Sequence, residues 1–327
     1  CVERCPIGQD VPGYIRLAGE GRHEEAFALI HETNPLPFIT GHLCDHQCMR
    51  ACTRMDWEGA VLIRDMKRVA AENGCEAFRD GGSAMKRRAP ARGVAAAVIG
   101  AGPAGLSAAS FLAREGFEVH VYEREREPGG VIRHTVPAFR VPVDAIAKDV
   151  SLLEDLGVRF HFGSSATVEG LRADGARYVL AAIGAERDRG IGIDGAREAL
   201  DFLREFRTDP KRPVLGKSVV VVGAGDTAMD AARAARRCRG VRDVRIVYRR
   251  SRREMPASRE DREDAEAEGV SFHFLRAPER WNDRTLVCRV MRLGEPDASG
   301  RPRPVPTDEV ESFPADAVIT ATGTEVD

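Results

Sequence analysis

Hydrophobic residues in the first part of the chain recur at helical spacing and form no strand-like run. Residues 11–35 read as helix broken by glycines, and residues 60–74 predict a second amphipathic helix that closes at Gly74. A stretch containing Gly, Arg and Pro follows and is typical of a linker. The pattern predicts a helical domain over residues 1–85 and a linker over residues 86–93.

From residue 94 onward, apolar runs alternate with amphipathic helices. Strand 94–100, helix 103–116 and strand 118–125 form a strand–helix–strand unit, and the pattern restarts at Lys217. Such units imply a parallel sheet, so the fold class is α/β with two Rossmann-like dinucleotide-binding domains. We expect the domains at 94–200 and 201–315, with 316–327 returning to the first of them.

Composition narrows the function classes. The 327 residues are 43% hydrophobic and 31% charged, with a formal net charge of −2, so nothing favours a nucleic acid or an acidic membrane surface as partner. There is no apolar run long enough for a membrane span and no secretory leader, so we expect a cytoplasmic protein. The chain begins with Cys1 inside a cysteine motif, which favours a fragment of a longer polypeptide.

The first glycine motif, "VIGAGPAG", places Gly100, Gly102 and Gly105 in the G-x-G-x-x-G pattern, with Pro103 and Ala104 between them. These glycines permit a tight turn, backbone approach to a pyrophosphate, and close packing of helix on strand. Glu123 follows 23 residues after Gly100, where a ribose hydroxyl partner is expected. The alternative is a glycine turn that holds no ligand.

The motif continues with "REPGG" and "VPAFRVP", which resemble segments of FAD-binding reductases that carry two dinucleotide sites. FAD is therefore the expected cofactor of the first unit. Besides the residues above, its predicted contacts are Arg124, Gly129, Gly130, Val131, Pro137, Arg140 and Gly184.

The second motif, "VVGAGDTAMDAA", supplies Gly223, Gly225 and Ala228, with Asp226 and Thr227 between them. The next strand ends on Arg249 and Arg250 instead of a carboxylate. Arginines pair with a 2′-phosphate, whereas a carboxylate would repel it, so the motif favours NADP(H) over NAD(H). The alternative is that both arginines are ordinary surface charge.

Two nucleotide sites in one chain indicate hydride transfer from reduced nicotinamide to flavin. A dithiol relay would need a C-x-x-C or C-x4-C pair, and neither spacing occurs. The N-terminal cysteines are then the natural electron acceptor.

Five of the eight cysteines lie in the first 52 residues, and Cys44, Cys48 and Cys52 follow at four-residue intervals. On a helix they would share one face as small buried hydrophobes. Zinc binding with His42 or His46 is a second alternative. Iron–sulfur ligation is favoured, since a "CP" pair that closes a cysteine run is typical of it and the dithiol relay is absent.

The motifs "CVERCP", "NPLPFITGHLCDHQCMRAC", "EPGGVIRHTVPAFR", "VVVVGAGDTAMDAARAA" and "VYRRSRREMPASRE" together resemble the glutamate synthase small (β) subunit family. That family is similar to the N-terminal electron-input region of dihydropyrimidine dehydrogenase. Within it, the resemblance is greatest to a glutamate-synthase-related subunit assigned to selenate reduction.

The resemblance implies two [4Fe–4S] clusters, one held by Cys1 and Cys52 and the other by Cys5, Cys44 and Cys48. Relatives complete the second cluster with an acidic or amide side chain where this chain has Lys67, and many carry a further cysteine where it has Thr40. An ammonium cannot ligate iron, so a single rearranged cluster on Cys5, Cys44, Cys48 and Cys52 is the alternative. The family's "GD" flavin contact follows the point where this chain stops, after Thr322 and Gly323.

The expected function is an NAD(P)H:acceptor oxidoreductase module that passes electrons from NADPH through FAD and the clusters to a partner domain or subunit. A ferredoxin-like domain is one candidate for this partner. One alternative is an assembly subunit that has lost flavin chemistry. Another is the input module of a fused pyrimidine- or purine-ring reductase. Glutamate synthesis, selenate reduction and ferredoxin reduction remain open as the terminal reaction.

Overall fold

The computed structural model describes residues 1–81, 88–185, 187–188, 190–282, 284–297 and 300–326, so the predicted linker lies partly outside the described residues. The chain forms two compact units. The first contains residues 1–133 and 138–184, and the second contains residues 134–137 and 185–327. Each unit is described by itself.

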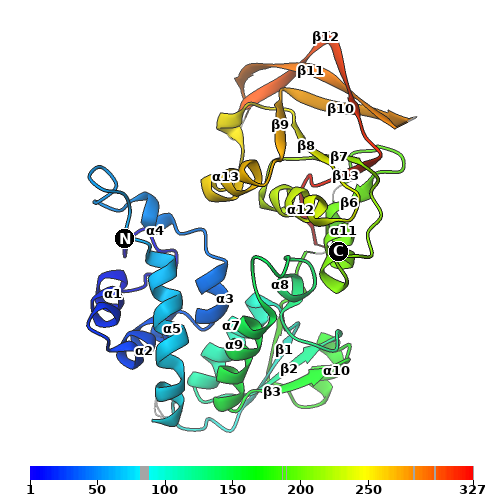
Figure 1. Cartoon of the computed structure of the whole chain (residues 1–327). Helices are drawn as coiled ribbons and strands as arrows, with labels where there is room; N and C mark the ends of the chain where they lie inside the picture. The colour runs from blue at the N-terminus through cyan, green and yellow to red at the C-terminus, as the bar shows by residue number, and fades with distance from the viewer. Residues whose placement is uncertain (82–87, 186, 189, 283, 298–299, 327) are drawn as a thin grey trace. The chain divides into compact units, whose positions relative to one another are not determined.

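The N-terminal helical region of the first unit is α-helical, as the spacing predicts (Figure 1). The prediction that the helix closes at Gly74 is wrong, because this helix continues to Asp80. A Cβ at Gly74 would lie 2.0 Å from the carbonyl oxygen of His23, so this glycine allows α2 and α5 to cross closely. In the core beside that crossing, the ring of Phe27 stacks on His31 and meets Phe78 edge-to-face. The helices are α1 (Val11–Gly19), α2 (His23–Thr33), α3 (Pro37–His42), α4 (Gln47–Arg50) and α5 (Ile63–Asp80).

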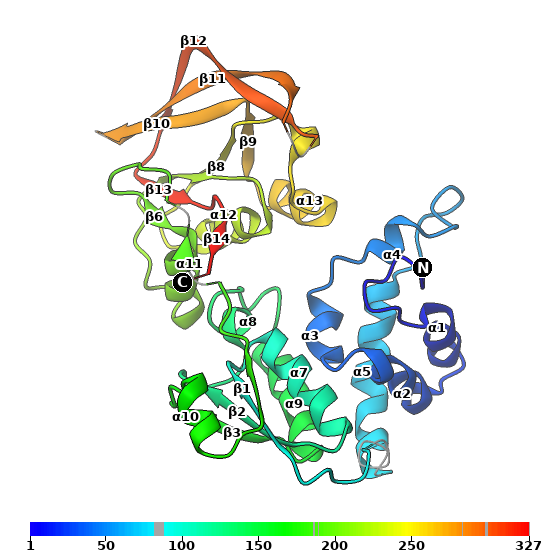
Figure 2. The same cartoon turned by 180° about the vertical axis from the view of Figure 1, so that it is seen from behind.

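The first Rossmann-like domain is a parallel sheet of order β3-β2-β1-β4. Helices α7 and α9 lie on one face of this sheet and α10 lies on the other, as Figures 1 and 2 show from opposite sides. The elements are β1 (Ala95–Ile99), α7 (Pro103–Arg114), β2 (Glu118–Glu123), α8 (Gly130–His134), α9 (Val143–Asp155), β3 (Arg159–Phe162), α10 (Val168–Ala173) and β4 (Tyr178–Ala181).

Helix α9 ties the N-terminal helical region to this sheet. The fully buried Asp149 accepts hydrogen bonds from the backbone N–H groups of Phe38 (3.0 Å) and Ile39 (2.7 Å) at the start of α3. One turn and a half further along, Asp155 accepts two hydrogen bonds from Arg79 of α5 at 2.6 and 3.0 Å. Helices α3 and α5 and the first glycine turn therefore belong to one compact body.

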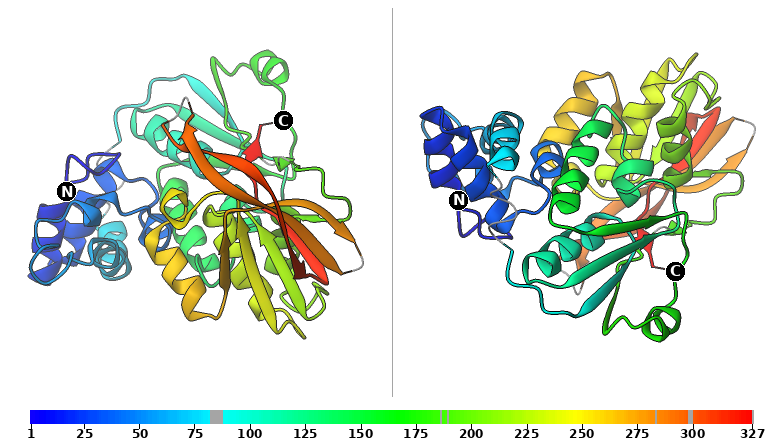
Figure 3. Two further views of the ribbon diagram at one scale, coloured as in Figure 1. Left: turned by 90° about the horizontal axis from the view of Figure 1, so that it is seen from above. Right: turned by 90° about the horizontal axis from the view of Figure 1, so that it is seen from below.

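The second unit is built on a five-stranded sheet of order β6-β13-β7-β8-β9. The run "SVVVV" of β7 faces two cores in alternation: Val219 and Val221 pack with the helices, and Val220 and Val222 pack with the antiparallel strands β10–β12. Figure 3 shows these orange-to-red strands crossing the parallel sheet. Strand β11 pairs antiparallel with β12.

The elements of the second unit follow in chain order. They are β5 (Arg187–Asp188), β6 (Arg197–Glu198), α11 (Ala199–Thr208), β7 (Ser218–Val222), α12 (Asp226–Arg237), β8 (Asp243–Tyr248), the 3-10 turn η1 (Arg252–Glu254), α13 (Arg259–Ala267), β9 (Ser271–Phe274), β10 (Arg276–Asn282), β11 (Thr285–Pro296), β12 (Pro302–Pro314), β13 (Ala317–Thr320) and β14 (Thr324–Glu325).

Candidate functional site: two dinucleotide turns and a cysteine cluster

Two glycines of the first turn are required by the protein itself. Gly100 has a φ of +104°, and a Cβ there would lie 2.4 Å from the carbonyl oxygen of Ala182 at the end of β4. A Cβ at Gly105 would lie 1.9 Å from the carbonyl oxygen of Gly100. Larger residues at either position would force strand, turn and helix apart.

Gly102 differs because nothing in the protein requires a glycine there. Its backbone has φ −76° and ψ 179°, which any residue adopts, and a Cβ would meet only Gly130 Cα at an ordinary 3.8 Å. Gly102 immediately precedes α7, where the unpaired N–H groups of the first turn attract an anion. The open space above its backbone therefore fits a pyrophosphate that lies against the chain.

Glu123 ends β2 and is 7% exposed. Its Oε2 accepts a hydrogen bond from Ala101 N at 2.7 Å, and its Oε1 accepts one from Glu125 N at 2.9 Å. A carboxylate has about four acceptor positions, so two remain after these bonds. Glu123 therefore fixes the glycine turn while keeping acceptor capacity for ribose hydroxyls.

The "EPGG" segment closes over the same turn. Gly129 N donates to the carbonyl oxygen of Ala101 at 2.8 Å, and Gly130 has a φ of +53° with space only for hydrogen, since a Cβ would lie 2.8 Å from Gly102 Cα. The other predicted flavin contacts are more scattered. Arg124 pairs with Glu125 at 3.9 Å, and Val131 is exposed. Gly184 follows β4 and has a φ of +78°. Pro137 belongs to the second unit, whereas Arg140 belongs to the first.

The second turn repeats the first in detail. Gly223 has a φ of +136°, and a Cβ there would lie 2.2 Å from the carbonyl oxygen of Ala321 at the end of β13. Gly225 has φ −89° and ψ 179°, and a Cβ would meet only Pro256 Cγ at 3.8 Å. Ala228 takes the third position and donates its N–H to the carbonyl oxygen of Gly225 at 2.9 Å. This turn fits a second dinucleotide for the same reasons.

The surroundings of the second turn are polar. Asp226 is the first residue of α12, followed by Thr227, and its carboxylate accepts a hydrogen bond from Ser258 N at 3.1 Å. Thr322 and Gly323 follow β13, and Gly323 has a φ of +109°. All four lie in the second unit. Asp226 and Thr227 belong to the predicted nicotinamide-nucleotide motif, whereas Thr322 and Gly323 belong to the segment that was expected to return to the first domain.

The two arginines after β8 have different environments. Arg250 is 8% exposed, donates to the carbonyl oxygen of Pro302 at 2.9 Å and pairs with Asp297 at 3.1 Å. Arg249 is exposed and makes no hydrogen bond or ion pair with any other described residue. Arg249 is therefore the guanidinium available to an incoming phosphate, whereas Arg250 holds β8 to the strands β11 and β12.

Three cysteines gather at the N-terminal helices. Burial, followed by the negative charges of Cys44 and Cys5, raises the pKa of the Cys48 thiol. His46 has a left-handed φ of 38° and donates its backbone N–H to the sulfur of Cys44 at 3.4 Å. Thiols close enough to influence one another, together with an N–H···S bond, are the kind of groups that surround an iron–sulfur cluster.

Cys52 has different neighbours. Backbone hydrogen bonds from Val61 and Arg54 lower the pKa of its thiol, and the α-amino group of Cys1 acts in the same direction. The expected division of the cysteines into a group of three and a pair of Cys1 and Cys52 stays a prediction. The alternative of one helical face is wrong, because α4 contains only Gln47–Arg50 and leaves Cys44 and Cys52 in loops.

Two polar side chains, Lys67 and Tyr14, are buried beside the three cysteines. Lys67 of α5 is 3% exposed; burial lowers its pKa and the negative charges of Cys44, Cys5 and Cys48 oppose that shift. Tyr14 of α1 is 1% exposed, and burial, followed by the same thiols, raises its pKa. Sequence analysis missed Tyr14, since nothing in its local sequence marks it. Among the described residues, no group of three His, Cys, Asp or Glu side chains has the geometry of a single-metal site.

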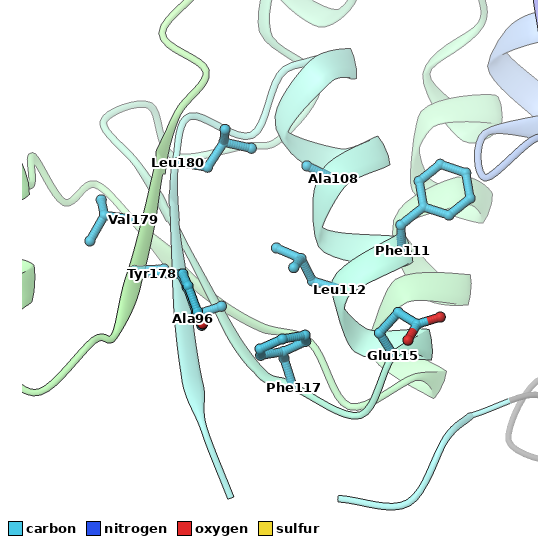
Figure 4. A pocket seen from close by; sticks show the side chains of 10 residues that line it. Ala96, Ala108, Phe111, Leu112, Glu115, Phe117, Tyr178, Val179 and Leu180 are labelled. Carbon is cyan, nitrogen blue, oxygen red and sulfur yellow. The ribbon is translucent and has the colours of Figure 1, made fainter. Parts of the chain in front are cut away.

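A separate hollow of about 530 Å³ lies at the edge of the first sheet (Figure 4). Side chains of α7, such as Leu112, and of β4, such as Leu180, line it together with Phe117. Its apolar lining, and its place beside the far end of α7 from the glycine turn, make it unsuited to a pyrophosphate. We therefore place no nucleotide in it.

The fold and the two glycine turns define a dinucleotide-binding oxidoreductase with an iron–sulfur region. Consistent with this, residues 94–327 match the family described as pyridine nucleotide-disulphide oxidoreductase, and residues 1–77 match dihydropyrimidine dehydrogenase domain II, 4Fe-4S cluster. The chain belongs to the pyridine nucleotide-disulphide oxidoreductase family. Its cofactors are accordingly FAD, NADP(H) and iron–sulfur clusters.

Three relatives place the chain more closely. It is 47% identical to YgfK of Escherichia coli strain K12, named as an oxidoreductase, over all of this chain and 32% of that one. It is 37% identical to the NADP(+)-dependent formate dehydrogenase subunit beta of Moorella thermoacetica, over all of this chain and 51% of that one. It is 36% identical to the glutamate synthase [NADPH] small chain of Azospirillum brasilense, over 99% of this chain and 72% of that one. The expected resemblance to the glutamate synthase small subunit is confirmed.

Two solved structures share the fold. Mycobacterium tuberculosis FprA in complex with NADPH aligns with a TM-score of 0.61 at 23% identity, covering 72% of this chain and 71% of that one. Histamine dehydrogenase from Rhizobium sp. 4-9 aligns with a TM-score of 0.55 at 19% identity, covering 72% and 37%. No described helix is both long and apolar enough to cross a membrane.

Proposed function

We propose that this chain is an electron-input module in which NADPH is oxidised at the second glycine turn and electrons leave through the N-terminal cysteines. When bound, NADPH supplies a hydride, FAD accepts it, and iron–sulfur clusters carry single electrons. The protein's own part is binding and orientation. The observation that carries the proposal is that Gly102 and Gly225 have the same extended backbone and the same unfilled space above it.

The cofactor contacts follow from the two turns. Gly102 and the start of α7 would hold the FAD pyrophosphate, and Glu123 would accept ribose hydroxyls. Gly225 and the start of α12 would hold the nicotinamide nucleotide, and Arg249 would pair with its 2′-phosphate. The remaining predicted contacts in each motif are part of the same proposal.

The cysteine groups provide the exit. Cys5, Cys44 and Cys48 would hold one cluster, and Cys1 and Cys52 would contribute to another. Asp149 and Asp155 fix α3 and α5, the helices that flank the cysteine segment 44–52, to helix α9 of the first dinucleotide-binding domain, so a flavin in that domain and the clusters would belong to one compact unit. The free thiols also support a cytoplasmic location.

The acceptor in this proposal is a partner domain or subunit. Several relatives are named as one subunit of a larger enzyme: a glutamate synthase small chain, a formate dehydrogenase subunit beta and an NADPH-Fe(3+) oxidoreductase subunit beta. The chain spans about a third of YgfK and half of the formate dehydrogenase subunit, so these relatives carry further sequence beyond the matched part.

The test is anaerobic addition of NADPH to the purified full-length protein, with flavin absorbance and the cluster EPR signal followed together. We expect the flavin absorbance to bleach and a reduced-cluster signal to appear. NADH at the same concentration is the matched comparison and should act more slowly. A flavin-loaded protein that NADPH does not bleach would refute the proposal and favour an assembly subunit.

A further inference from the structure

Lys67 is a buried basic side chain that makes no ion pair with a carboxylate among the described residues. It lies on the core face of α5, between Ile63 and Ala70, and both of these pack in one apolar cluster with Tyr14 and Cys48. No hydrogen bond or ion pair of Lys67 is present in the described part of the chain. A charged side chain in such a place is strongly unfavourable unless something compensates it.

The anions that act on Lys67 are sulfur atoms. Cys44, Cys5 and Cys48 are the groups whose charge favours its protonated form. Asp149 is also within electrostatic reach, but both of its oxygens accept backbone N–H groups of α3. Thiols become thiolates when they ligate iron, so negative charge would reach Lys67 chiefly when the three cysteines are loaded.

We propose that Lys67 is an electrostatic partner of the cluster held by Cys5, Cys44 and Cys48, and that its charge raises the reduction potential of that cluster. This inference rests on the proposed iron–sulfur function and deepens it. Reduction adds one negative charge to the cluster, and a neighbouring buried cation favours the more negative state. The cluster beside Lys67 would therefore be the better electron acceptor of the two.

A second consequence concerns the protein without iron. There no iron-bound thiolate compensates Lys67, which stays buried among Tyr14, Ile63 and Ala70. Removing its charge should therefore make the iron-free helical region more stable, while the same change lowers the potential of the loaded cluster. These opposite effects separate an electrostatic role from a general structural one.

The test uses the full-length protein with Lys67→Leu and a control, Arg68→Leu. Arg68 is the next residue of α5 and is half-exposed, paired with Asp65 at 3.3 Å and Glu72 at 4.0 Å, so the control removes the same charge outside the core. Midpoint potentials are measured by EPR during dithionite titration. We expect Lys67→Leu to shift the reduction equilibrium toward the oxidised cluster at least about tenfold, or about 59 mV for one electron. Arg68→Leu should shift it less than about threefold, because exposed charges are screened.

The iron-free proteins are compared by thermal unfolding, and we expect the midpoint of Lys67→Leu to rise above that of the wild type. A potential that changes no more than in Arg68→Leu, or a lower iron-free midpoint, would overturn the inference. Lys67→Met is the second variant; if both variants fold but neither retains iron, Lys67 supports assembly and the inference is wrong. A wild-type protein without iron also overturns it, whereas failure of NADPH to bleach the flavin overturns only the proposed function.

Discussion

Replacing Asp149 with alanine should loosen helix α3 from helix α9. The Asp149 carboxylate is fully buried in α9 and accepts hydrogen bonds from the backbone N–H groups of Phe38 and Ile39. These groups belong to the first turn of α3, which has no side-chain cap of its own. Asp149 therefore caps a helix that lies more than a hundred residues earlier in the chain.

The expected magnitude follows from the two orphaned donors. Each buried N–H left without an acceptor costs about 1–3 kcal/mol, so two cost about 2–6 kcal/mol. Removing a buried carboxylate relieves its desolvation, which places the net loss for Asp149→Ala near the lower end, about 2–3 kcal/mol. Asp149→Asn keeps one acceptor and should lose about 1–2 kcal/mol.

Hydrogen exchange at the Phe38 and Ile39 amides is the direct assay, with urea unfolding of the whole protein beside it. The control is Asp155→Asn in the same helix, which removes a half-exposed pair with Arg79 and should cost about 0.2–1 kcal/mol. We expect faster exchange at Phe38 and Ile39 in Asp149→Ala alone. Equal exchange in both variants would refute the assignment of Asp149 as the cap of α3.

The same residue predicts a pH dependence. Burial raises the pKa of Asp149 to about 8, against the opposing hydrogen bonds from Ile39 and Phe38 and the charge of Lys67. A carboxyl with a higher pKa in the folded state binds its proton more tightly there, so stability falls as pH rises from about 4 to 8. Asp149→Asn should flatten this slope in urea titrations of the iron-free protein. An unchanged slope would show that Asp149 does not titrate in this range.

Further predictions concern the nucleotide turns. Gly102→Ala should leave the free energy of unfolding of the flavin-free protein within about 0.5 kcal/mol of wild type but abolish flavin retention, whereas Gly105→Ala should lower both stability and flavin retention. Calorimetry measures the stability and flavin release measures the retention. A destabilised Gly102→Ala would contradict the inference that the space above Gly102 is open. Arg249→Ala should weaken NADPH binding at least about tenfold, or about 1.4 kcal/mol, with little change for NADH in titration calorimetry. Arg250→Ala should instead destabilise the second unit by about 1–3 kcal/mol, by removing the bonds of Arg250 to Asp297 and to the carbonyl oxygen of Pro302, and affect both nucleotides alike.

The elements that sequence analysis predicted correctly are those specified locally. Gly100 and Gly105 are required by contacts within one strand–turn–helix unit, so their spacing alone identified the turn. The valine run of β7 is buried on both faces, which produces the uninterrupted apolar pattern of a central parallel strand. In both cases the information lies within a few consecutive residues.

The errors arise where distant residues decide the outcome. Gly74 has the signature of a helix end, but the crossing of α2 over α5 is what requires it. The four-residue spacing of Cys44, Cys48 and Cys52 suits a helical face, but the left-handed His46 and the short α4 separate them. Asp149 acts only through α3, so no local pattern could mark it.

The distinction between the two nucleotide sites lies at the strand tips and not in the glycine turns. Both turns have a first glycine fixed by the end of a neighbouring strand and a second glycine with the same extended backbone. Since the turns recognise only what all dinucleotides share, discrimination must come from the strand that follows. Glu123, tied to its own turn, offers acceptors for ribose hydroxyls, whereas Arg249 offers an unpaired cation among the described residues. In the proposed function, the same scaffold would therefore separate a flavin dinucleotide from a phosphorylated nicotinamide dinucleotide by the charge at a single strand end.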